Sequence, residues 1–173
     1  AIFSKSMKYY INTFSNINTP TQITINDNTG KTLTTLIDNK RLADKVAKLD
    51  IVSKEFFTFK TSDGVELNGW MMKPANFDPN KKYPVIMHQY SGPGSQQVTD
   101  RWNIGSRSDG GMFETYMAQQ GFISVCVDGR GTGGRGAEFE KCTYLNLGVK
   151  EARDQVETAL YLGTLPYVDK NNI

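Results

Sequence analysis

The chain has 173 residues, of which 38% are hydrophobic and 22% charged; this composition excludes a disordered chain and fits one packed domain, or a small domain with a fragment attached. Its 20 basic and 18 acidic residues give a net charge of +2 without a basic cluster, so the charge indicates neither nucleic acid nor an anionic membrane as a partner. No apolar run has the length of a membrane span, and Cys126 and Cys142 lack metal-binding or redox spacing.

The first forty residues are predicted to form β-strands. Residues 8–13 are aromatic and β-branched, and residues 22–25 alternate between polar and apolar. Residues 31–37 can return as a partner strand after an Asn- and Gly-containing turn at residues 26–30. One hairpin and one further strand are too few for a stable β domain, so we expect residues 1–40 to belong to a larger sandwich or propeller.

A short helix is predicted to join this segment to a second domain. Residues 38–39 can cap the helix, and apolar side chains at positions 42, 46 and 49 share one face. We therefore interpret residues 41–50 as a linker helix and place the start of the second domain at residue 51.

The second domain is predicted to begin with a hairpin of residues 55–60 and 65–73, joined by a tight turn at residues 63–64. Two short apolar runs, residues 83–89 and 122–127, are interpreted as buried strands.

Two helices complete the predicted pattern. Residues 111–120 form a helix that stops at Gly121, and residues 148–162 form an amphipathic helix. The apolar face of the second helix is predicted from Val149, Ala152, Val156 and Leu160. The predicted order is hairpin, strand, helix, strand and helix, followed by residues that enter a further strand. This order predicts an α/β fold with a parallel sheet and right-handed crossovers.

A glycine-rich loop follows the second buried strand. Gly129, Gly131 and Gly134 match the G-x-G-x-x-G string of dinucleotide-binding loops, in which backbone N–H groups hold a pyrophosphate. However, that string belongs in a first βα turn with a helix opening inside it, and the five glycines of residues 129–136 disfavour a helix there. We favour tight turns beside a neighbouring loop and expect no cofactor or metal ion; dinucleotide binding at Gly129–Gly136 is the alternative.

A serine nucleophile would be expected in a G-x-S-x-G turn between a buried strand and a helix, and the chain has no such turn. The nearest stretch, residues 106–110, does not follow a buried strand and is interpreted as a surface loop that caps the next helix. His88, the single histidine, ends a core strand and is interpreted as a packed imidazole rather than a catalytic base.

Tyr90 lies just past the first buried strand, at the start of the loop before the next helix. In hydrolases this loop supplies part of the oxyanion hole, and a tyrosine hydroxyl can donate the required hydrogen bond. A partly buried tyrosine with a satisfied hydroxyl fits the pattern equally well, so the residues alone leave both interpretations open.

Three stretches resemble one family, in order and at fitting spacing. Residues 81–96 resemble the K-K-Y-P…Y-x-G-P-x-S-Q stretch of dipeptidyl peptidase IV-like enzymes of the prolyl oligopeptidase family. Residues 127–133 resemble the D-G-R-G-[ST]-G loop of that family, and residues 154–159 its D-Q-[IV]-x-x-[AV] helix. The resemblance implies that residues 51–173 are the front part of an α/β-hydrolase domain, truncated before the nucleophile elbow, and that residues 1–40 are terminal propeller strands.

The resemblance also implies a serine exopeptidase that releases N-terminal dipeptides, usually after Pro or Ala, through an acyl-enzyme. Tyr90 matches the oxyanion tyrosine of the family, whereas the serine, aspartate and histidine of the triad come later than Ile173. We therefore expect the chain alone to be inactive, and also unstable or self-associating, because a parallel sheet that lacks its next strand exposes an edge. A triad-free hydrolase-fold binding module is the alternative.

The partners implied by this resemblance are a peptide substrate and the remainder of the protein's own propeller and hydrolase domains. A homodimer, and a periplasmic, membrane-anchored or extracellular location, are implied by the family alone; no residue pattern in the chain indicates them.

Overall fold

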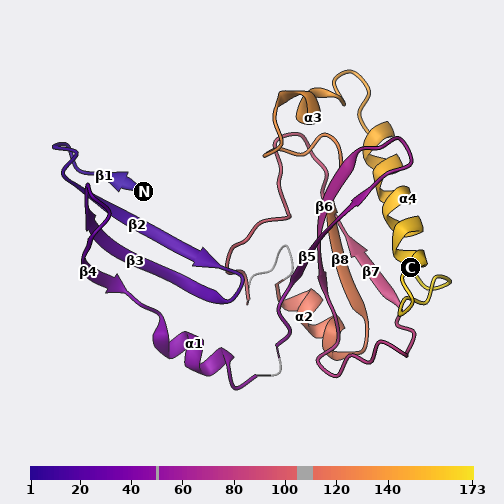
Figure 1. Cartoon of the computed structure of the whole chain (residues 1–173), viewed down its shortest axis with the longest axis horizontal. Coiled ribbons are helices and arrows are strands. Elements are labelled where there is room, and N and C mark those ends of the chain that lie inside the picture. The colour runs from indigo at the N-terminus through magenta and orange to yellow at the C-terminus, as the bar shows by residue number, and fades with distance from the viewer. Residues whose placement is uncertain (50, 105–110) are drawn as a thin grey trace. The chain divides into compact units, whose positions relative to one another are not determined.

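The computed structural model describes residues 1–49, 51–104 and 111–173 (Figure 1). These residues form two compact units. The first unit contains residues 1–51 and 100–102, and the second contains residues 52–99 and 103–173.

The first unit is an antiparallel sheet with the strand order β1-β2-β3-β4. Long pairing between β2 and β3 is followed by a turn in which the Asp27 carboxylate accepts backbone N–H groups of Thr29 and Lys31, at 2.9 and 3.0 Å. This confirms the predicted turn and shows one strand that the sequence pattern missed, because two residues are too few to alternate. The strands are β1 (Ile2–Phe3), β2 (Tyr9–Asn16), β3 (Thr19–Asp27) and β4 (Thr32–Ile37).

Helix α1 (Lys40–Val46) follows β4, close to the predicted place, but only one of the two predicted capping residues caps it, and its apolar face differs from the prediction. Asn39 has a left-handed backbone, and its side-chain amide donates to the Thr21 carbonyl at 2.6 Å instead of capping the helix. Leu42 and Leu49 are exposed. The cap comes from Asp38 instead, whose carboxylate accepts the backbone N–H of Lys40 at 3.0 Å, so the predicted cap is confirmed at one of its two residues.

The second unit has a mixed sheet with the order β5-β6-β8-β7, in which β8 pairs parallel to β7 and antiparallel to β6 (Figure 1). The hairpin, the two buried strands and the two predicted helices are all present, which confirms the α/β fold. The strands are β5 (Glu55–Lys60), β6 (Glu66–Met72), β7 (Val85–His88) and β8 (Ile123–Asp128), and the helices are α2 (Met112–Gln119), α3 (Ala137–Lys141) and α4 (Val149–Thr164).

All six residues of β8 are buried, so this strand has a packed face on each side of the sheet. Ile123, Val125 and Val127 belong to one apolar cluster together with Leu162 of α4. Cys126 packs on the opposite face, in a second cluster with Trp70. Because strand side chains alternate with a period of two, one apolar run can supply both clusters.

Helix α4 packs through a different face from the one predicted. Its buried residues are Asp154, Thr158 and Leu162, while Val156 and Leu160 are 60% and 66% exposed. The apolar periodicity predicted the wrong face because two of the three buried residues are polar, and both form hydrogen bonds within the protein. Thr158 donates its hydroxyl to the Asp154 carbonyl at 2.7 Å, and Asp154 binds an arginine, as described below.

The chain after α4 returns to the outer edge of β7. Val168 forms a parallel bridge with Tyr83, and the Asn172 carbonyl accepts the Val85 N–H at 2.9 Å. This arrangement confirms that residues 167–173 begin to align as a further strand of the sheet. In the described ranges, no helix is long and apolar enough to cross a membrane.

Candidate active site

Two loops leave the same edge of the second sheet. Residues 89–99 follow β7 and residues 129–136 follow β8, and these neighbouring strands run parallel with His88 opposite Cys126. Ligands of open α/β sheets bind beyond the carboxyl ends of the strands, so this edge is the candidate site.

Tyr90 has an exposed side chain in the candidate site, with 68% of its surface accessible. Its ring lies against the backbone of Gly92, where an added Cβ would be only 2.5 Å from Tyr90 Cε1. In the described part of the chain no residue hydrogen-bonds the Tyr90 hydroxyl. The interpretation of Tyr90 as a partly buried, satisfied tyrosine therefore does not fit, and the hydroxyl is available to a ligand.

The loop beyond Tyr90 folds back in a tight turn. Ser91 is 5% exposed and has a left-handed backbone with φ of 50°, a conformation that costs a non-glycine residue energy. The Gly92 carbonyl then accepts both the backbone N–H and the hydroxyl of Ser95, at 3.0 and 2.5 Å. This turn forms the surface on which the Tyr90 ring lies.

The returning arm of this loop is bound by Asp128, the last residue of β8. The Asp128 carboxylate accepts the backbone N–H of Val98 at 2.8 Å and that of Gln97 at 3.0 Å. Asp128 is only 4% exposed, and such charge-assisted bonds are stronger than neutral ones. The sequence analysis did not identify this residue as part of the site.

The glycine-rich loop is packed against protein groups at each position of its G-x-G-x-x-G string. A Cβ on Gly129 would be 3.2 Å from the Asp154 side chain, and one on Gly131 would be 3.0 Å from Thr143. At Gly134, which has φ of 83°, a Cβ would be 2.8 Å from the amide of Gln96 in the neighbouring loop. These contacts confirm the interpretation of close turns beside a neighbouring loop.

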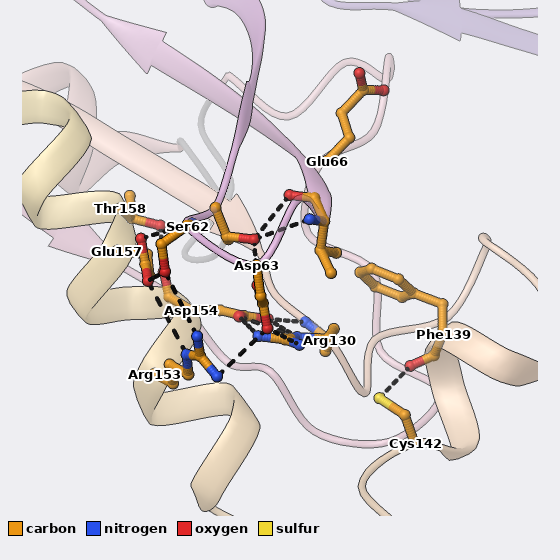
Figure 2. Close-up of polar contacts among 12 residues, drawn as sticks. Ser62, Asp63, Glu66, Arg130, Phe139, Cys142, Arg153, Asp154, Glu157 and Thr158 are labelled. Atoms are coloured by element: carbon orange, nitrogen blue, oxygen red, sulfur yellow. Dashed lines mark hydrogen bonds and ion pairs between the residues drawn. The ribbon is translucent and has the colours of Figure 1, made fainter.

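Arg130 anchors the glycine-rich loop to α4, as Figure 2 shows. Its Nη2 donates to Asp154 at 2.5 Å, its Nε donates to both Asp154 oxygens at 3.0 and 3.1 Å, and its backbone N–H donates at 2.7 Å. Asp154 is fully buried, and the hydrogen bonds that its carboxylate accepts raise the pKa of the Arg130 guanidinium. Four hydrogen bonds therefore hold this arginine and aspartate together.

A second layer of charges surrounds this pair at the turn between β5 and β6 (Figure 2). Asp63 accepts Arg130 Nη1 at 2.9 Å and lies 3.4 Å from Arg153. Ser62 hydrogen-bonds Glu157 through its hydroxyl and its backbone N–H, which lowers the pKa of the Glu157 carboxyl. The hairpin turn, the glycine-rich loop and α4 are thus held by one polar network.

Acid is expected to weaken this network through Asp63. The pKa of the Asp63 carboxyl is lowered from 3.8 to about 2. The hydrogen bond from the Thr61 hydroxyl has the largest effect, and the hydrogen bond from Arg130 comes next. Because the pKa is lower in the folded state, the contribution to stability is present above the unfolded value of about 3.9 and is lost as the pH falls towards about 2. Urea unfolding should show Asp63→Asn less stable than the parent at about pH 5, with the difference shrinking towards about pH 2. An equal difference at both pH values would contradict this expectation.

An apolar hollow of about 580 Å³ borders the loop that carries Tyr90. The hollow can receive an apolar group beside this loop. Its lining residues are Pro93, Glu140, Lys141, Thr143, Tyr144, Leu145 and Leu147.

The other residues that the sequence analysis considered contribute less to the site. His88 is half-buried at the end of β7, opposite Cys126, and residues 106–110 lie outside the described residues. In the described ranges, no group of three or more His, Cys, Asp or Glu side chains could hold a metal ion. Sequence reasoning assigned no role to Asp128 or to the Arg130–Asp154 pair, because their hydrogen-bond partners lie far away in the sequence.

The comparisons of this chain with known protein sequences agree with one another. The sequence model of the prolyl oligopeptidase family matches residues 112–173. A probable dipeptidyl peptidase 4 of Aspergillus flavus is 32% identical over 176 residues, which cover 100% of this chain and 22% of the relative. A probable dipeptidyl-aminopeptidase B of Arthroderma gypseum is 39% identical over 174 residues, covering 99% of this chain and 18% of the relative.

Solved structures agree with these sequences. Porphyromonas gingivalis dipeptidyl peptidase 4 matches 100% of this chain and 24% of its own, with a TM-score of 0.93 and 47% identity. A putative dipeptidyl aminopeptidase IV from Bacteroides ovatus matches 99% of this chain and 24% of its own, with a TM-score of 0.84 and 37% identity. The chain therefore spans about a fifth of the length of its curated relatives.

Proposed function

Because the chain belongs to the prolyl oligopeptidase family, in its dipeptidyl peptidase IV-like branch, we propose that it is the front part of the catalytic domain of a serine exopeptidase. That longer protein, called the full-length protein below, releases N-terminal dipeptides whose second residue is Pro or Ala. In the proposed domain organisation, residues 1–40 are terminal propeller strands, residues 41–50 link the domains, and residues 51–173 start the hydrolase domain.

The proposed role of Tyr90 is to stabilise the oxyanion. In acyl transfer a serine oxygen attacks the scissile carbonyl, and the carbonyl oxygen becomes negatively charged. A hydroxyl held where that charge develops stabilises the transition state more than the bound substrate. The role is supported by the exposure of the Tyr90 phenol, whose ring rests on Gly92 at the carboxyl end of a parallel strand. Within the described residues, no protein group hydrogen-bonds its hydroxyl.

The nucleophile is proposed to lie beyond these 173 residues. Residues 167–173 align beside β7, so the strand they begin would reach the same edge of the sheet as Tyr90. A serine turn at the end of that strand would bring the nucleophile near the phenol. The 173-residue chain alone is therefore expected to lack peptidase activity.

Peptide cleavage tests this proposal directly. The full-length protein, incubated with peptides that differ only at the second residue, should release the N-terminal dipeptide when that residue is Pro or Ala, as detected by mass spectrometry. A serine-directed phosphonate should block the release, and the 173-residue chain should release nothing. Absence of cleavage by the full-length protein would instead favour the binding module, and release of single residues would contradict the proposed specificity.

A further inference from the structure

We propose that Asp128 is a positioning residue that acts through Tyr90, by holding the far arm of the loop on which the phenol is placed. This inference rests on the proposed peptidase function. Asp128 itself does not touch substrate in this proposal; it sets where the Tyr90 hydroxyl stands when the oxyanion forms.

The strand register brings the two residues to the same level of the sheet. His88 pairs with Cys126 in the parallel β7–β8 ladder, and Tyr90 and Asp128 each lie two residues further along their own chains. Parallel neighbours advance together at about 3.3 Å per residue. The phenol and the carboxylate therefore leave adjacent chains at the site edge.

The Asp128 carboxylate closes the loop that begins with Tyr90. The chain leaves β7, turns at residues 92–95, and returns to Asp128, whose oxygens accept the N–H groups of Gln97 and Val98. A further bond, from the Gly133 N–H to the Ser95 carbonyl at 2.7 Å, ties the middle of the loop to the glycine-rich loop. The loop is thus held at its start by the strand and at its far arm by Asp128.

The contact between Tyr90 and Gly92 transmits this hold to the phenol. The ring rests on the turn backbone so closely that a Cβ on Gly92 would collide with it. In the described part of the chain no hydrogen bond fixes the hydroxyl end. A shift of the turn therefore moves the ring, and a misplacement of about 1 Å can cost about a hundredfold in rate.

Asp128→Asn in the full-length protein is the test. Asparagine keeps the size and one acceptor oxygen, but its amide nitrogen cannot accept an N–H. We expect kcat for dipeptide release to fall about tenfold to a hundredfold while KM changes little. Amide hydrogen exchange of residues 89–99 should become faster. The matched control is Asp27→Asn, which changes a carboxylate that also accepts two backbone N–H groups, in the first-unit hairpin, and should leave kcat unchanged.

A double-mutant cycle separates positioning from a general structural role. If Asp128 acts through Tyr90, Asp128→Asn should have little further effect on kcat once Tyr90→Phe is present. An equal loss in both backgrounds would overturn the proposal, although the peptidase function and the role of Tyr90 would stand. If the full-length protein were inactive, or if its Tyr90→Phe variant were fully active, the proposed function would be overturned and this inference with it.

A second variant keeps the test decisive if Asp128→Asn does not fold. Ser95→Ala removes the hydroxyl bond to the Gly92 carbonyl and leaves the backbone bond in place. It should lower kcat in the same direction by a smaller factor, again only while the phenol is present. No effect on kcat from Ser95→Ala, together with unchanged hydrogen exchange of residues 89–99, would overturn the proposal.

Discussion

Tyr90→Phe in the full-length protein should lower kcat for dipeptide release by about a hundredfold to a thousandfold, equivalent to about 2.7–4 kcal/mol of transition-state stabilisation. KM should change little, because the hydroxyl is expected to bond the oxyanion and not the uncharged carbonyl of the bound substrate. The ring itself remains and can keep its contact with Gly92. Steady-state kinetics on a dipeptide-releasing substrate measures both constants.

Tyr116→Phe is the matched control for this experiment. Tyr116 is also an exposed tyrosine, on α2, with 57% of its surface accessible. Removing its hydroxyl should leave kcat and KM unchanged. If Tyr90→Phe behaved like Tyr116→Phe, the phenol would have no part in the chemistry, and the oxyanion donor would have to be another group.

Asp154→Asn should lower the free energy of unfolding by about 3–5 kcal/mol, because it leaves the Arg130 charge without its buried partner. The two side chains are 0% and 10% exposed, so water cannot replace the lost carboxylate. Asparagine has nearly the same size, so the loss reports the charge and its hydrogen bonds and not a cavity. Urea unfolding followed by the fluorescence of buried Trp70, which lies in this unit, measures it.

Arg153→Ala provides the comparison for the buried pair. Arg153 contacts Asp63 at 3.4 Å and Glu157 at 4.0 Å, but its side chain is 51% exposed. Exposed ion pairs contribute only about 0–1 kcal/mol, so this variant should be nearly as stable as the parent. Equal losses from Asp154→Asn and Arg153→Ala would refute the stabilising role assigned to burial. Replacing both partners, as in Arg130→Met with Asp154→Leu, should recover part of the loss.

The sequence predicted the elements of the second unit well because local signals agreed there. β5 was predicted with its observed bounds, since an apolar strand leads into an Asp-Gly turn that determines the hairpin. Gly121 ended α2 as expected, with φ of 89°. Where turn chemistry and periodicity indicate the same structure, little tertiary information is needed.

The errors arose where tertiary contacts replaced local ones. The apolar stripe of α4 is exposed because Asp154 and Thr158 occupy the buried side of the helix. Asp154 pairs with Arg130, and the Thr158 hydroxyl donates to the Asp154 backbone carbonyl. At the start of α1, Asp38 caps the helix as expected, whereas the Asn39 amide hydrogen-bonds the Thr21 carbonyl. Periodicity counts apolar residues and cannot identify a polar residue whose partner is far away in sequence.

The candidate site was predictable only in part. Tyr90 could be found because it follows a buried strand, and the resemblance to a known family gave it a proposed role. Asp128 lies on a strand whose other members are nearly all apolar, and its partners are backbone N–H groups of another loop, which leave no trace in side-chain patterns. Its place in the site becomes visible only when the two loops are seen together.

The packing of the glycine-rich loop has a practical consequence for recognising proteins from motifs. Here the three glycines of the G-x-G-x-x-G string lie against side chains of the same protein, and the arginine inside the string is held by an aspartate 24 positions later. An acidic residue at such an offset does not by itself indicate nucleotide binding, although dinucleotide-binding folds also carry one about 20 residues after the string. A match to the glycine string therefore predicts a nucleotide site only when a helix also opens inside it after a first strand, and in this chain neither condition holds.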